Sequence, residues 1–312
     1  MYGQFFILFG LILVGYYCNK KGYLPLETNK NVGHMVMRVT IPAMLITTIA
    51  SIEITDRVLR AFLLSAAGQI AMMVVFGFLM RQYGRKRGLD SRLLPMLDLT
   101  AGSLNTGFIG LPVTMIFFGQ AGIIYMSAGV LALNLYLWSY GVYLISDKKA
   151  TGAAAIGKSF LQGAINPNCI SILLGLLLAV THTARFVPTV VLGFLTKVGD
   201  LSTPLSLIYI GALAGGSGIV QLFKEKMALE ISVVKMIGMP ALAILAMLFI
   251  PADGLAKSVF LLSVCMPSAA VVPMRYGYGD KMSSDIVLWT TVLSMATLPL
   301  SVLLAAKLYG AV

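Results

Sequence analysis

Two stretches of the chain combine glycine, proline, hydroxyl and amide residues in apolar surroundings, a pattern suited to binding a small solute. The first reads AGSLNTGFIGLPV over 101–113, and the second reads CMPSAAVVPMRYGYG over 265–279. Glycine and proline interrupt helices, because glycine is conformationally free and proline lacks a backbone donor. In a membrane, irregular backbone is tolerated only where protein buries it or where it lines a cavity. The two stretches therefore predict two unwound helices that line a binding site.

The sequence lacks the residue patterns that a metal site or a catalytic site would need. His34 and His182 are the only histidines, and the three cysteines lie far apart in apolar runs. The apolar segments hold no zinc-ligand spacing, no HExxH or GxSxG motif and no paired aspartates. We therefore expect no metal, no cofactor and no enzymatic activity.

The composition indicates a protein embedded in a lipid bilayer. Of 312 residues, 58% are hydrophobic and 11% charged, with a mean hydropathy of +0.90. Soluble domains are roughly 45–50% apolar and about 25% charged. A spanning helix needs about 20 mostly apolar residues. This criterion predicts an all-α membrane protein with ten spans, at about 2–18, 31–51, 59–80, 93–118, 121–146, 166–181, 187–213, 227–250, 254–274 and 284–309.

The distribution of basic residues predicts the orientation. The formal net charge is +11, from 23 lysines and arginines against 12 acids. Fifteen basic residues lie in the loops after odd-numbered spans, and five lie on the opposite side. Because cytoplasmic loops are enriched in Lys and Arg, both termini are expected outside the cytoplasm, in the cell membrane. The cluster RQYGRKR over 81–87 sets this topology, and we expect no nucleic-acid partner.

The chain also repeats itself weakly. Residues 22–45 align with 185–207, which pairs Pro25 with Pro188 at an offset of 163 and Pro42 with Pro204 at an offset of 162. The same offset places Leu104 and Asn105 opposite Pro267 and Ser268. For Pro42 and Pro204 alone, ordinary proline kinks explain the pattern equally well.

The repeat predicts two halves, 1–150 and 151–312, with five spans each. Because five is odd, the second half enters the membrane inverted. Inverted repeats with broken helices are typical of secondary transporters, whose sites lie near the middle of the membrane.

Several motifs resemble the auxin efflux carrier family, which includes the plant PIN-type carriers and bacterial transporters of small carboxylates. They are SLNTGFIGLPV over 103–113, INPNCISILLGL over 165–176 and MPSAAVVPMRYGYGD over 266–280, supported by MRVTIPAML over 37–45 and VGDLSTPLSL over 198–207. The resemblance covers essentially the whole chain. It implies that the fourth and ninth helices cross at unwound centres.

The resemblance further implies two functional units. A scaffold of helices 1, 2, 6 and 7, at about 1–51 and 166–213, holds a transport unit at about 59–146 and 227–309. The transport unit carries its substrate by an elevator-like shift. Homodimerisation through the scaffold is expected.

Individual residues follow from the same resemblance. The family's crossover asparagine corresponds to Asn105 and its helix-nine proline to Pro267, whereas Leu104 replaces a proline of the plant members. A glutamine of helix five becomes Asn134 and a nearby tyrosine becomes Ser139, which suggests a substrate other than indole acetate. The expected substrate-binding residues are Asn105, Thr106, Gly107, Asn134, Ser139, Pro267 and Ser268, and the expected breaks involve Gly102, Pro112, Pro267 and Pro273.

Helix physics favours an anion at such a site. A half-helix that begins at an unwound centre presents free N–H groups and the positive end of its dipole. We therefore expect a carboxylate to bind there without a buried lysine or arginine.

Other polar residues have two interpretations each. Asn166 and Pro167 form a helix start more readily than a ligand site. Arg38 and Asp200 each precede a proline by four residues, and they either pair as a coupling site or extend to the interface. Glu230 lies five residues before Lys235 and four after Lys226. Either a local pair on one helix or involvement with substrate or protons is therefore compatible with these residues.

Asp98 is expected at the interface, and ion coupling has little support. Between Arg60 and Arg81 the third span offers only Ser65 and Gln69 as polar side chains. This composition argues against sodium and leaves proton coupling or a uniporter open.

The sequence thus predicts a secondary transporter of mono- or dicarboxylates. The alternatives are a ligand-binding membrane receptor that moves nothing and a sodium-coupled carrier resembling the bile acid symporters. An intramembrane enzyme ranks last.

Overall fold

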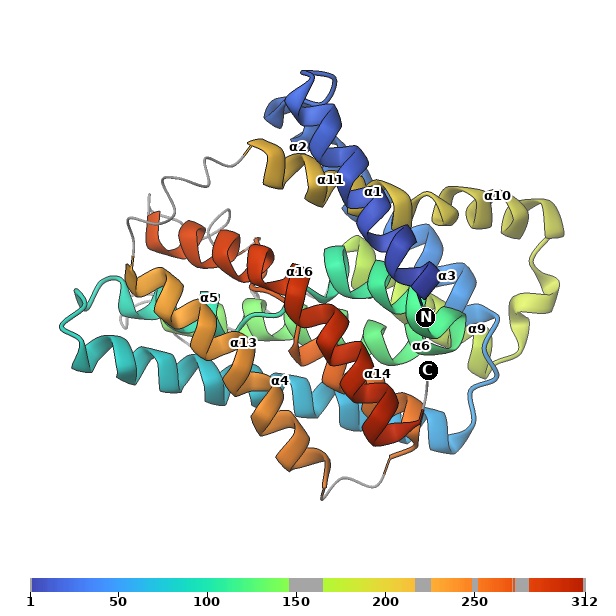
Figure 1. The fold of residues 1–312 in the computed structure, drawn as a ribbon. Coiled ribbons are helices and arrows are strands. Elements are labelled where there is room, and N and C mark those ends of the chain that lie inside the picture. The colour runs from blue at the N-terminus through green and yellow to red at the C-terminus, as the bar shows by residue number, and fades with distance from the viewer. Residues whose placement is uncertain are drawn as a thin grey trace.

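The computed structural model describes residues 2–145, 165–216, 226–248, 252–270, 272 and 281–310. All regular elements in these ranges are helices (Figure 1). Six helical segments within them are long and apolar enough to cross a membrane: Leu26–Ala50, Asp56–Lys86, Leu94–Ile145, Thr189–Gly216, Lys226–Met247 and Lys281–Tyr309. The prediction of an all-α membrane protein is confirmed.

The first half contains α1 (Tyr2–Lys20), α2 (Leu26–Met35), η1 (Val36–Thr40), α3 (Ile41–Ala50), α4 (Asp56–Lys86), α5 (Leu94–Gly102), η2 (Thr106–Gly110), α6 (Leu111–Leu135), η3 (Tyr136–Gly141) and α7 (Val142–Ile145). The second half contains α9 (Pro167–Val180), η4 (Thr183–Phe186), α10 (Thr189–Asp200), α11 (Ser202–Gly216), α13 (Lys226–Met247), α14 (Gly254–Val264) and α16 (Lys281–Tyr309). The elements η1, η2 and η3 are π-helical turns, which frequently occur at functional sites.

The longest apolar segment, Leu94–Ile145, folds back on itself. Its 52 residues would extend about 78 Å as one straight helix, against a bilayer core of about 30 Å. The chain leaves helical geometry between α5 and η2, and again at Gly119, where φ is 61° and ψ is −159°. Glycine adopts this conformation without a steric penalty. The predicted spans 93–118 and 121–146 therefore meet at Gly119.

Pro42 and Pro112 do not interrupt the helical segments that contain them. Each stands just after a π-helical turn, η1 or η2, whose last residue is itself helical, and α3 or α6 continues from it. The seventh predicted span changes direction at Leu201, between α10 and α11, and Pro204 lies in the first turn of α11. The prolines are therefore accommodated within or at the start of helices.

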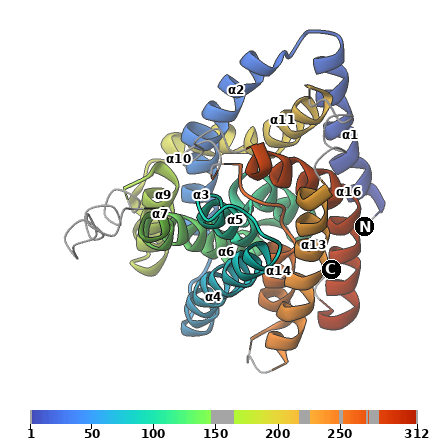
Figure 2. The same cartoon turned by 90° about the vertical axis from the view of Figure 1, so that its left-hand side faces the viewer.

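The contact between α1 and α11 depends on glycine. A methyl group at Gly15 would lie 2.0 Å from the backbone oxygen of Ile208, and one at Gly211 would lie 1.9 Å from that of Ile12. Small residues let membrane helices approach to backbone contact. In Figure 2, α1, α2 and α11 lie above the bundle that contains α4, α5, α6, α13 and α14.

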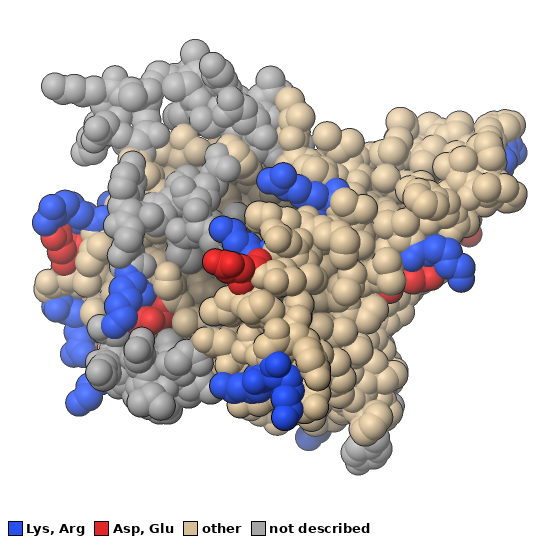
Figure 3. Space-filling model, turned by 90° about the horizontal axis from the view of Figure 1, so that it is seen from above, with Lys and Arg blue, Asp and Glu red and all other residues tan. Residues whose placement is uncertain are grey.

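The outer surface is largely apolar. Large hydrophobic side chains are exposed on several helices, including Phe6 at 80%, Val190 at 81% and Ile237 at 65%. Much of the described surface in Figure 3 carries no charged side chain, and Lys and Arg lie in separate groups. This distribution suits contact with lipid.

The glycine contact can be tested by substitution. Gly15→Ala should destabilise the protein by about 1–3 kcal/mol, because its methyl group would collide with backbone. Gly10→Ala is the matched control on α1, since nothing lies within 4 Å of a methyl group there. Thermal unfolding in detergent measures both variants, and equal melting temperatures would show that the close contact is unimportant.

Candidate functional site

Two unwound segments far apart in sequence meet in the core. Helix α5 ends at Gly102 and η2 begins at Thr106, while α14 ends at Val264 and the chain stays non-helical through residue 269. The backbone N–H of Asn105 donates to the backbone oxygen of Pro267 at 2.8 Å. The backbone N–H of Ala269 donates to Ser103 Oγ at 3.0 Å. The two stretches identified from the sequence therefore bond directly to each other, and we call this contact the crossover.

Gly102 permits the break to pack tightly against the neighbouring helices. A methyl group there would lie 2.4 Å from the backbone oxygen of Met73 and 2.5 Å from the hydroxyl of Tyr136. Pro112 lies downstream of the break, and Pro273 lies outside the described residues.

Asn105 caps the helix that follows the break. Its Oδ1 accepts a hydrogen bond from the backbone N–H of Phe108 at 3.3 Å. Its Nδ2 group donates to no partner in the described part of the chain, and the residue is partly exposed. The neighbouring Thr106 hydroxyl is buried and equally without a partner there. The crossover thus has unused donors beside the start of η2 and α6.

The accessible side of the crossover faces η1 and α11. A methyl group at Gly107 would lie 3.9 Å from the sulfur of Met37. The ring of Phe108 stacks on that of Tyr209, with centroids 4.9 Å apart. These contacts join η2 to two helices assigned to the scaffold from the sequence.

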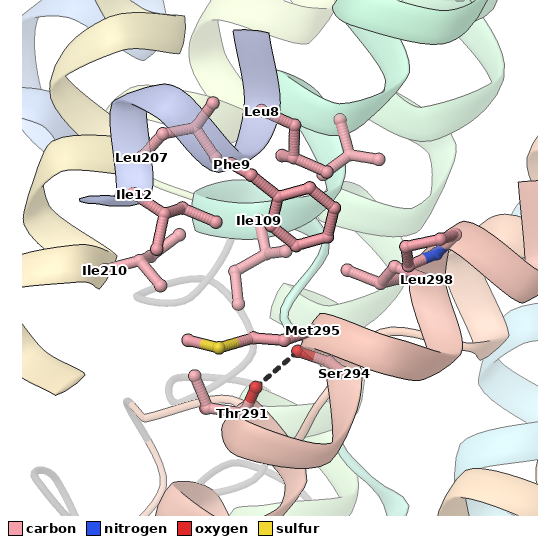
Figure 4. Close-up of a pocket in the computed structure, with 12 residues that line it drawn as sticks. Leu8, Phe9, Ile12, Ile109, Leu207, Ile210, Thr291, Ser294, Met295 and Leu298 are labelled. Carbon is pink, nitrogen blue, oxygen red and sulfur yellow. Dashed lines mark hydrogen bonds between the residues drawn. The ribbon is translucent and has the colours of Figure 1, made fainter. Parts of the chain in front are cut away.

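The cavity near this contact cannot hold a carboxylate in this structure. Figure 4 shows side chains from α1, η2, α11 and α16 converging on it, including Ile109, Ile210 and Met295. Its volume of about 20 Å³ is close to that of one water probe. A substrate at the crossover would therefore need a different approach or a shift of these helices.

Behind the crossover lies a buried lysine. Lys235 of α13 has no exposed surface, and its ammonium donates to the backbone oxygen of Ser103 and to Ser268 Oγ, the latter at 2.9 Å. The backbone N–H of Ser268 donates in turn to Thr290 Oγ1 at 3.1 Å. A buried lysine thus lies at the crossover, because α13 packs against both broken helices, and the expectation that a carboxylate can be held without one stays a prediction.

A local pair between Lys235 and Glu230, compatible with their spacing, does not form. Glu230 instead accepts hydrogen bonds from the Tyr83 hydroxyl and, at 3.0 Å, from Arg87 on the neighbouring α4 segment. The sequence did indicate a role for Lys235, because it lies inside an apolar span. Ionisable residues there are energetically unfavourable and commonly functional.

The hydrogen bonds of Asn134 and Ser139 go to residues outside the crossover. Asn134 donates to the backbone oxygen of Val130 at 2.8 Å and accepts from Asn166 Nδ2 at 2.9 Å. Ser139 donates to the backbone oxygen of Leu135 in its own helix. In the described part of the chain, neither side chain has a hydrogen bond to Asn105 or Ser268. Asn166 accepts from the backbone N–H of Cys169 at 3.0 Å, so its predicted capping role is confirmed.

The two charged residues proposed as a pair, Arg38 and Asp200, do not bond to each other in the described part of the chain. Arg38 and Asp200 are both exposed, and the described residues contain no ion pair between them. Asp200 lines a cavity of about 360 Å³ between α3, α6, α10 and α11.

Asp98, expected at the interface, is fully buried. It accepts from the Tyr140 hydroxyl at 3.0 Å and lies 4.0 Å from Arg81. Residues of α4 and η3 cover this aspartate, since Arg81 lies against its carboxylate, Tyr140 donates to it and Tyr136 bonds to its backbone oxygen.

The bond between the two breaks can be tested at Ser103. Ser103→Ala should lower the free energy of unfolding by about 1–3 kcal/mol, because the buried N–H of Ala269 loses its acceptor. Ser127→Ala is the control: this serine is equally buried but bonds only within its own helix, to the oxygen of Ile124. If thermal unfolding shows the two variants equally stable, the bond across the crossover contributes nothing.

Comparisons with known proteins agree with this architecture. A family described as membrane transport protein matches residues 1–302. The chain is 26% identical over 296 residues to an uncharacterized transporter of Methanothermobacter thermautotrophicus, covering 93% of both proteins. It is 24% identical over 300 residues to an uncharacterized transporter of Methanocaldococcus jannaschii, covering 93% of this chain and 94% of the relative. The chain belongs to this membrane transport protein family, that of the auxin efflux carriers.

Proposed function

We propose that this membrane transporter is a secondary carrier of small organic anions, either mono- or dicarboxylates, that binds its substrate at the crossover. The observation that carries the proposal is the unused donor capacity of Asn105. Its oxygen serves the helix cap, and its amide N–H₂ group is left beside the helix start. A carboxylate offers the acceptors that this group lacks.

The helix that follows Asn105 supplies further attraction for an anion. At this helix start the backbone N–H groups of Thr106 and Phe108 already bond to the backbone oxygen of Leu104 and to Asn105 Oδ1, so the attraction comes from the aligned peptide dipoles, which make this end positive. Here η2 and α6 continue in one direction from Thr106 to Gly119. The Thr106 hydroxyl adds a donor that has no partner in the described residues. Together these groups favour a carboxylate over a cation.

The internal repeat supports alternating access. The offset of 163 relates α1 to α9 and α3 to α11, and the contact of α1 with α11 is matched by that of α9 with α3. It likewise relates α5 to α14 and α6 to α16, and α14 contacts α6 as α16 contacts α5. We propose ten spans in two inverted repeats, 1–150 and 151–312, since such exchanged contacts are expected of them.

The proposed movement is an elevator-like shift. The transport unit, at about 59–146 and 227–309, would slide along the scaffold at about 1–51 and 166–213. The contacts of Phe108 with Tyr209 and of Gly107 with Met37 lie on this boundary. We further propose a cell-membrane location, both termini outside the cytoplasm by the distribution of basic residues, and a homodimer formed through the scaffold.

The role of Asn105 is testable with two variants. Asn105→Ala loses both the cap and the amide, and it should lose about 1 kcal/mol of stability together with transport. Asn105→Ser keeps a capping oxygen but lacks the N–H₂ group, so it should fold like the parent and still fail to transport. Uptake of radiolabelled lactate, pyruvate, malate and succinate into proteoliposomes measures transport, and melting temperature measures folding.

The serine variant separates the two roles of this residue. Uptake by Asn105→Ser at the parental rate would show that the asparagine is only a cap. Binding of these anions by the parent protein without any uptake would instead favour a receptor over a carrier.

A further inference from the structure

The buried lysine of α13 has no acidic partner in the described part of the chain. Lys235 is completely shielded from solvent, and no described carboxylate lies within 4.0 Å of its ammonium group. Its two acceptors are uncharged, namely the backbone oxygen of Ser103 and the hydroxyl of Ser268. An isolated buried charge is strongly unfavourable. A protonated Lys235 therefore requires compensation by the dipoles that surround it.

The position of the two acceptors supplies this compensation. Ser103 is the residue that ends α5, where unpaired carbonyl groups and the negative end of the helix dipole attract a cation. Ser268 belongs to the unwound segment after α14. The ammonium of Lys235 therefore lies between the two breaks and binds one oxygen from each. It extends from α13, which packs against α4, α5, α14 and α16.

Oxygen atoms at a carbonyl-rich helix end would also suit a small hard cation. A lysine ammonium is a compact charge with three donors, so it can fill such a position permanently. An arginine or a neutral residue could not reproduce this combination of size and charge.

We propose that Lys235 is a tethered cation that takes the place of a bound coupling cation behind the crossover and holds its two breaks in register. The replacement of a coupling cation rests on the proposed transport function. The effect of Lys235 on the two breaks can be tested by thermal stability, without transport. It predicts that the carrier needs neither sodium nor potassium. It also predicts that a free ammonium can replace the side chain.

Chemical rescue tests the proposal directly. Lys235→Ala removes a propylammonium group and leaves a space of that shape, whereas Lys235→Met fills most of the space without charge. We expect both variants to melt several degrees below the parent and to lose transport by about tenfold or more, because the helix end loses its counter-charge. Added propylammonium should restore at least half of the lost melting temperature in Lys235→Ala and should leave Lys235→Met unchanged.

The additive needs its own control. Tetramethylammonium has the same charge but no N–H donor, so it should rescue neither variant. Neutral propylamine crosses lipid and can reach the buried space from either side. Equal effects of propylammonium on Lys235→Ala and Lys235→Met, or no effect on either, would overturn the proposal.

A second measurement uses the unmodified protein and remains decisive if the alanine variant does not fold. Sodium and potassium are replaced by choline on both sides of the proteoliposomes. The melting temperature should stay the same and the uptake rate should change by less than about twofold, because the cation position is already filled. A requirement for sodium or potassium would contradict the tethered cation. Failure of the parent to transport any of the four carboxylates would count against the proposed function alone, since the rescue of melting temperature does not depend on flux.

Discussion

The structure depends on satisfying backbone polar groups where two membrane helices unwind. Water is scarce in the centre of a bilayer, so an unpaired N–H or carbonyl group there costs several kcal/mol. The unwound segments 103–105 and 265–269 supply hydrogen-bond partners to each other. Asn105 donates to Pro267, and Ser103 accepts from Ala269. Each unwound segment therefore requires the other, and the two halves of the chain are joined at this point.

The charge distribution around the crossover follows from the same constraint. The negative end of α5 lies against Lys235, which binds both breaks from behind. The positive end of η2 and α6 lies on the other side, with the amide of Asn105 unused. The lysine is thus placed to stabilise the architecture, while the helix start on the opposite side remains available to an anion.

Local patterns could be read from the sequence, whereas contacts between helices could not. The breaks were recognisable because glycine, proline and small polar residues cluster within single spans. The cap at Asn166 was recognisable because capping depends on neighbours three residues away. Spacing along one helix offers Glu230 as a neighbour of Lys235, but the partners of this lysine are Ser103 at the end of α5 and Ser268 in the segment after α14. The partners of Asp98 were not visible in the sequence for the same reason, since they come from α4 and η3. Asn134 matched a family position, yet its bond to Asn166 depends on how α6 meets α9.

The most direct test of the account is a structure determined with a transported carboxylate bound. The account predicts a carboxylate oxygen at hydrogen-bond distance, about 3 Å, from Asn105 Nδ2 and beside the first turn of η2. A carboxylate found instead in the cavity of about 360 Å³ next to Asp200, with the amide of Asn105 still unpaired, would contradict it.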